Sequence, residues 1–170
     1  GNINGLKQKY LFCALFSAGT MIPLGFEFGF RKRPHVVNSK PTDWEKTDID
    51  LTPFIASVNT VKKRYSVFQE ESPTTVFPHQ NPNILLMWKA SVKTHDEALL
   101  ILNKDIWNHQ DFFVDNFRPY VQAGAALADV SPEYPQIYLH EPFHYALRPG
   151  QGIVLVTTRD KNGALNGNNV

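Results

Sequence analysis

The chain of 170 residues has one cysteine, two methionines and no marked excess of either charge. Cys13 cannot form a disulfide within the chain, and its place in an apolar run predicts a buried side chain. The formal net charge of +1 gives no general attraction to nucleic acid or to membranes, so neither is expected as a partner. No Asn-x-Ser/Thr sequon is present, and the sequence therefore gives no sign of N-glycosylation.

The sequence also has no uninterrupted apolar run long enough to cross a membrane. Residues 7–19 imitate the basic, apolar and small-residue order of a secretory signal. The chain begins with Gly1 instead of Met, and residues 21–30 continue as a second apolar segment, so we favour a helix of the fold. Secretion stays open as the alternative to a cytoplasmic location.

Two helices are predicted in the first 72 residues. Residues 5–18 are good helix formers and apolar on every side in their second half, which indicates burial all round. A short aromatic strand is predicted over residues 21–30. The second helix begins at Thr52, a natural N-cap, with Pro53 at the first helical position. Its apolar face follows helical spacing and consists of Phe54, Val58, Val61, Tyr65 and Phe68.

From Thr74 onward the pattern changes to short β-rich runs separated by turn residues. These runs cover residues 74–77, 84–92, 98–103, 112–115, 137–139, 145–147 and 153–158. Such punctuation is typical of an antiparallel sandwich. The predicted fold class is therefore α+β, with a helix–strand–helix segment over residues 1–72, a β-sandwich over residues 73–160 and a frayed tail over residues 161–170.

The helix–strand–helix segment does not form a complete unit, because one strand between two helices cannot bury both of its own faces. It has the pattern of the end of a parallel α/β layer.

Four elements, taken in order, carry a resemblance to a known family. Residues 18–27 read Ala-Gly-Thr-Met-Ile-Pro-Leu-Gly-Phe-Glu, and residues 43–45 read Asp-Trp-Glu. Residues 54–63 have the apolar–Asn–x–apolar–basic pattern of a helix, and residues 99–103 are a strand-like run that ends in Asn. The chain resembles the C-terminal part of an α-amylase superfamily enzyme (glycoside hydrolase family 13), and Gly25-Phe26-Glu27 resembles its maltosyltransferase branch.

The resemblance implies the last strand and helix of an eight-stranded (β/α) barrel, followed by a C-terminal sandwich. It implies a parent enzyme that acts on an α-glucan or maltooligosaccharide, by a retaining mechanism with two carboxylates and no cofactor. The Asn-His-Asp-like motif of the family is absent from this sequence. No catalytic residue is therefore assigned, and the chain alone is expected to be inactive. Pro23 is displaced from its usual place and residues 62–65 lack an Arg-rich ending, so hydrolase and transferase both stay open.

Four residues are candidates for the rim of the substrate site: Gly25, Glu27, Trp44 and Trp107. Glu27 has two interpretations, a supporting hydrogen bond or direct substrate contact. Trp44 and Trp107 offer aromatic faces for sugar rings, whereas Trp88 lies mid-strand and is expected in the core. The basic residues 31–33 are either a solvated loop or a phosphate contact.

Residues 140–144 match the zinc-peptidase pattern His-Glu-x-x-His. That site requires a helix, which Pro142 and the strand-like flanks oppose. A turn between strands is predicted there instead, and no metal site is expected.

A self-standing β-sandwich module that binds carbohydrate or protein is the alternative function. Under either reading, the open strand edge of residues 21–30 would allow a homo-oligomer.

Overall fold

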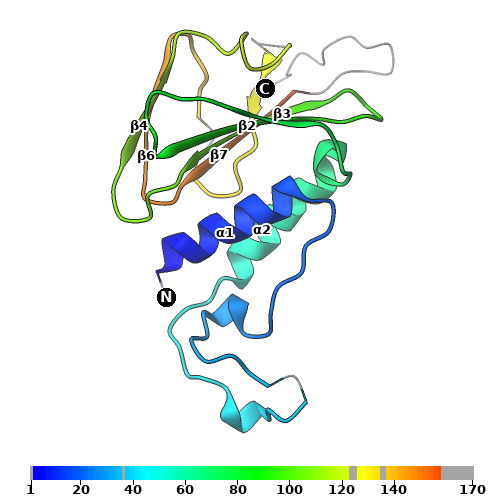
Figure 1. Cartoon of the computed structure of the whole chain (residues 1–170), viewed down its shortest axis with the longest axis vertical. Coiled ribbons are helices and arrows are strands. Elements are labelled where there is room, and N and C mark those ends of the chain that lie inside the picture. Colours follow the sequence, from blue (N-terminus) through cyan, green and yellow to red (C-terminus); the bar gives the residue numbers. More distant parts are fainter. Residues whose placement is uncertain (1, 36, 123–125, 135–136, 158–170) are drawn as a thin grey trace.

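The computed structural model describes residues 2–35, 37–122, 126–134 and 137–157. It contains three layers: a helix pair, a five-stranded sheet and a two-stranded sheet (Figure 1). The helices are α1 (Ile3–Phe16) and α2 (Thr52–Arg64), with short 3₁₀ helices η1 (Phe26–Phe28), η2 (Pro41–Asp43) and η3 (Ser66–Phe68). The strands are β1 (Thr74–Phe77), β2 (Ile84–Ala90), β3 (Glu97–Asn103), β4 (Gln110–Val114), β5 (Ala128–Asp129), β6 (Phe143–Leu147) and β7 (Gly152–Thr157).

The larger sheet has the order β1-β2-β3-β7-β5, and the smaller sheet pairs β4 with β6. All the strand pairs in the described residues are antiparallel. The α+β class and a sandwich-like arrangement of two sheets therefore agree with the prediction. The predicted tail, residues 161–170, lies outside the described residues.

Strand β3 lies at the centre of the larger sheet and is buried at every position. Because side chains alternate between the faces of a strand, its residues serve two cores. Leu99 and Ile101 face β4 and β6, in a core that also contains Phe112 and Phe143. The remaining face of the sheet carries Leu100 and is covered by the helices.

The helices and the sheet share a single core. Its buried members are Tyr10, Leu11, Ala14, Leu15, Val58, Val67, Phe68, Met87, Ala98, Leu100, Leu102, Val154 and Val156. The predicted apolar face of residues 54–68 is confirmed by this contact, although α2 ends at Arg64 and Phe68 belongs to η3. The Tyr10 hydroxyl also donates a hydrogen bond to the Asn59 side chain of α2, at 2.7 Å.

Several predicted elements are wrong. Residues 21–30 form no strand: they run as coil into η1, because Gly25 and Gly29 adopt the left-handed conformation and turn the chain. Residues 137–139 are also coil, and the two-residue strand β5 was too short to predict. Cys13 is exposed, because only one face of α1 packs on the sheet.

Within the described residues, we find no helix that combines the length and the apolar character needed to span a membrane.

Candidate functional site

The connection between α1 and α2, described over residues 17–35 and 37–51, projects away from the sheets and is called the arm below (Figure 1). Its base is closed by backbone contacts: the Leu51 amide donates to the Glu27 carbonyl at 2.8 Å, and the Thr47 hydroxyl donates to the Phe28 carbonyl. Phe26 of η1 packs against Tyr10 of α1, with ring centroids 6.1 Å apart. The arm is therefore attached to the body of the fold through η1.

Gly25 begins the turn that shapes this base. Its φ of 84° lies in the left-handed region, and its carbonyl accepts a hydrogen bond from the Phe30 amide at 3.0 Å. A Cβ atom at position 25 would stand 2.1 Å from Cδ2 of Phe30. Glycine is therefore required both by the backbone and by the ring that covers it.

Phe30 connects this turn to the far part of the arm. Its ring meets the Trp44 ring edge-on, with centroids 6.4 Å apart and planes 60° apart. The Phe28 ring lies next to the Phe30 ring, with their centroids 6.1 Å apart. Gly25 and Trp44 thus both lie against Phe30, a ring that the sequence reasoning missed, and a third rim candidate, Glu27, lies in the same arm in η1. The alternation of phenylalanine at positions 26, 28 and 30 was the signal that pointed to this ring.

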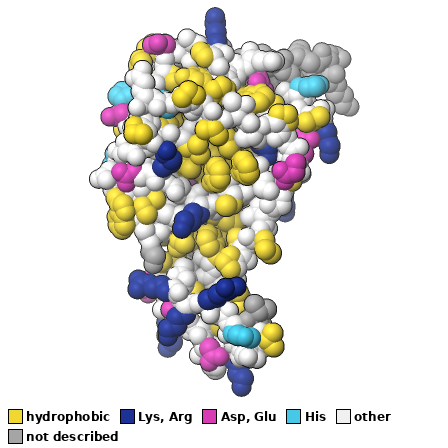
Figure 2. Space-filling model, viewed as in Figure 1, with side chains coloured by type: hydrophobic (Ala, Val, Ile, Leu, Met, Phe, Trp, Pro, Cys, Tyr) yellow, Lys and Arg dark blue, Asp and Glu magenta, His cyan; other side chains and the backbone are white. Residues whose placement is uncertain are grey.

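Glu45 binds the backbone amides of two basic residues of the arm, Arg31 and Lys32. The Glu45 carboxylate accepts hydrogen bonds from the amides of Lys32, at 3.0 Å, and Arg31. The Lys32 amide contributes most to a lowered pKa of Glu45, and the neighbouring positive charges lower it further. Residues 31–33 are exposed, and Figure 2 shows Lys and Arg side chains gathered over the arm.

Glu27 is half-buried, and its backbone carbonyl accepts the hydrogen bond from the Leu51 amide. In the part of the chain that the structure describes, no side chain or amide forms a hydrogen bond with its carboxylate. The structure therefore supplies no partner for the supporting role, and the carboxylate is available as an acceptor.

Trp107 lies away from the arm, in the loop between β3 and β4, and is 73% exposed. The Asp105 carboxylate accepts from the amides of Trp107 and Asn108 at 2.8 and 3.1 Å, which fixes the turn. Ile106 of this loop contacts the beginning of α1. Trp88 is half-buried against the sandwich core and donates its indole N–H to Glu97 at 2.9 Å.

The His-Glu-x-x-His segment does not form the helix that a zinc-peptidase site needs. His140 lies in coil and His144 in β6, where it contacts the Asp111 carboxylate at 3.2 Å. Across the described ranges, no group of three His, Cys, Asp or Glu side chains is placed to hold a metal ion.

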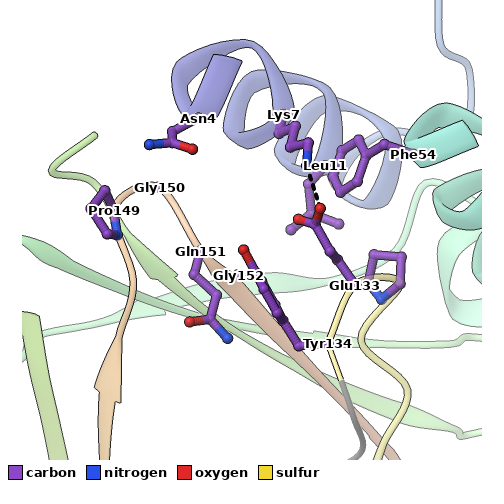
Figure 3. Close-up of a pocket in the computed structure, with 11 residues that line it drawn as sticks. Asn4, Lys7, Leu11, Phe54, Glu133, Tyr134, Pro149, Gly150, Gln151 and Gly152 are labelled. Atoms are coloured by element: carbon purple, nitrogen blue, oxygen red, sulfur yellow. Dashed lines mark hydrogen bonds and ion pairs between the residues drawn. The ribbon is translucent and has the colours of Figure 1, made fainter. Parts of the chain in front are cut away.

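A small cavity lies between α1 and the loops that precede β6 and β7 (Figure 3). The Lys7 ammonium reaches across it to the Glu133 carboxylate, and Lys7 also lies over the Phe54 ring at 5.3 Å. Its free volume of ≈ 20 Å³ has room for about one water molecule. It is too small for a sugar ring.

No protein-family model and no curated protein sequence matches the chain.

Proposed function

We propose that this chain is the C-terminal part of an α-glucan-active enzyme of the α-amylase superfamily, of the maltosyltransferase-like branch, and that the arm contributes to the rim of the substrate site. The observation that carries the proposal is the contact of Phe30 with both Gly25 and Trp44. The resemblance takes Gly25 and Trp44 from two separate sequence elements, and Phe30 brings these elements together in space.

The chemistry of the arm suits binding, not bond cleavage. Trp44 is 43% exposed, and an indole face can stack on a pyranose ring. The Glu27 carboxylate can accept hydrogen bonds from sugar hydroxyls. Cations at residues 31–33 can pair with the phosphate of a sugar phosphate such as maltose 1-phosphate. The two carboxylates of a retaining mechanism would lie in the catalytic part of the parent enzyme.

The first part of the arm, before Gly25, gives further support. Met21 is 96% exposed and Leu24 is 52% exposed, in a stretch that forms no strand. Exposed apolar side chains next to each other favour a surface that other polypeptide covers. In the family that the chain resembles, this stretch corresponds to the last barrel strand, which lies between neighbours. A cytoplasmic location belongs to the same proposal.

A titration with maltoheptaose tests the proposal. The chain has three tryptophans, so a ¹H–¹⁵N spectrum resolves one indole signal for each. We expect the Trp44 signal to shift and saturate in the millimolar range, while Trp88 serves as an internal reference. Cellohexaose, with β-1,4 linkages, is the matched control ligand and should shift none of them. An unmoved Trp44 signal would reject the proposal.

The alternative, a self-standing carbohydrate- or protein-binding sandwich, is favoured by one observation. Trp107 is highly exposed on a turn that Asp105 holds in place. A rigid, exposed indole is a suitable contact for a sugar or a partner protein. In this case the titration would shift the Trp107 signal instead of Trp44, and Trp107→Ala would abolish the response.

A further inference from the structure

The C-terminal end of α1 has none of the usual helix-ending devices of its own. Ser17, the C-cap, is extended with φ −104° and ψ 149°, and no glycine in the left-handed conformation follows it directly. The last turn also has no basic residue to balance the helix dipole. The carbonyl groups there have few intrahelical partners, so they need donors from elsewhere.

Two lysines from other elements supply these donors. Lys62 of α2 donates to the carbonyls of Ala14 and Ser17. Lys89 of β2 donates to the Phe16 carbonyl at 2.6 Å. We call Lys62 and Lys89 the lysine pair. Both ammonium groups thus converge on the point where the chain leaves α1.

Lys89 is only 1% exposed, which is unusual for a lysine. It shares the helix-facing side of β2 with Met87, a member of the apolar core. Burial lowers the pKa of Lys89, and it lowers the pKa of Lys62 as well, with Lys89 adding a like-charge effect. An apolar residue at position 89 would avoid this desolvation, so stability alone does not account for the lysine.

A carboxylate completes the arrangement. Glu71 accepts hydrogen bonds from the Ala18 amide at 2.9 Å and the Ser17 hydroxyl at 3.2 Å. Glu71 and Glu70 are the negative charges that act on Lys89. The first two residues of the arm are therefore held at the Ser17 carbonyl by Lys62 and at the Ala18 amide by Glu71, while Lys89 holds the Phe16 carbonyl at the end of α1.

We infer that Lys62 and Lys89 are positioning residues, which fix the direction in which the chain leaves α1 and so set the path of residues 17–24 toward Gly25. The functional part of this inference, that the path matters for glucan contact at Trp44, rests on the proposed function.

Amide hydrogen exchange of Lys62→Met and Lys89→Met tests the positional part. We expect the Ala18 amide to exchange at least tenfold faster in each variant, while the amides of β3 keep their rates and the melting temperature does not fall. Lys63→Met is the matched control, since Lys63 is exposed on the same helix, and Lys62→Arg should restore protection. Unchanged Ala18 protection in both Met variants overturns the inference. A uniform loss of protection that includes β3 also overturns it, because the lysines would then be general stabilising groups.

The maltoheptaose titration of the same variants tests the functional part. We expect the Trp44 response to need several-fold more ligand in Lys62→Met and Lys89→Met than in Lys63→Met. If the unaltered chain responds and the Met variants respond equally, the link between the lysine pair and the rim is wrong. If the unaltered chain gives no response, the proposed function fails, and the exchange rates still decide whether the lysines position the arm.

Discussion

The ring of Phe30 occupies the place that a side chain at position 25 would need. A Cβ atom built on Gly25 would lie 2.1 Å from Cδ2 of Phe30, and the φ of 84° already disfavours any other residue. Through the same ring, the turn at Gly25 is connected to Trp44. The conformation of the turn and the position of the exposed indole are therefore coupled.

Gly25→Ala should break this coupling. The left-handed conformation costs an L-residue about 1–2 kcal/mol, and the methyl group must displace the Phe30 ring. We expect the Trp44 indole signal to move in the free protein and its response to maltoheptaose to weaken.

Gly19→Ala is the control for this substitution, because an added Cβ atom there meets nothing within 4 Å. Its Trp44 signal should stay in place. Equal spectra of the two variants would show that Phe30 does not link the turn to Trp44.

Val58→Ala should destabilise the helices and the sheet together. Val58 is fully buried in the core shared by α1, α2 and the larger sheet, and removing its methyl groups costs about 2 kcal/mol. Urea denaturation followed by far-UV circular dichroism and by tryptophan fluorescence should give one shifted transition. Lys63→Ala, at an exposed position of α2, should leave the midpoint unchanged. Two separate transitions would mean that residues 1–72 unfold independently of the sandwich.

Acidification should release the start of the arm from Glu71. Hydrogen bonds from the Ala18 amide, and then from the Ser17 hydroxyl, lower the pKa of Glu71 below its ordinary value of 4.5. Because the charged form is favoured in the folded state, the stabilising contribution is present above pH 4.5 and is lost as the pH falls through the lowered pKa. The chemical shift of the Ala18 amide proton should titrate with a midpoint below 4.5. A midpoint at or above 4.5, or a titration that persists in Glu71→Gln, would contradict this contact.

The chain alone should neither hydrolyse nor transfer α-glucan. A retaining mechanism needs two carboxylates placed on either side of the scissile bond, and the motif elements that provide them in the α-amylase superfamily are absent from the sequence. Incubation with maltoheptaose, alone or with maltose 1-phosphate, should give no product by chromatography. Product formation that co-purifies with the chain would refute this prediction.

The parts of the fold that were predicted correctly depend on local patterns. The β1 strand has the predicted bounds, residues 74–77, because turn residues flank a short β-branched run. The start of the α2 helix was predicted to within one residue from the Thr-Pro sequence, but Thr52 is the first helical residue and Leu51 is the N-cap, so the predicted capping role of Thr52 is wrong. The central strand β3 was recognisable as a continuous apolar run.

The errors arose where the outcome depends on distant residues. Residues 21–30 are apolar enough for a strand, but a strand also needs a neighbour to pair with, and the described residues provide none there. Cys13 was expected to be buried because α1 is apolar on all sides, yet the sheet covers only one of them.

The candidate site shows the same limit. Gly25, Glu27 and Trp44 could be selected as candidates from the sequence. The role of Phe30 could not be predicted, because its contact with Trp44 joins residues 14 positions apart. The partners of Lys89 lie 73 positions away in the sequence, at the end of α1, and no local pattern predicts them.

The proposal that this chain belongs to a longer α-glucan-active enzyme can be decided by reading the coding sequence upstream of Gly1. We expect the open reading frame to continue upstream and to encode a (β/α) barrel with a nucleophilic Asp, a general-acid Glu and an Asn-His-Asp-like motif before the helix that opens this chain. An initiator codon immediately before Gly1, or an upstream sequence without these carboxylates, would contradict it.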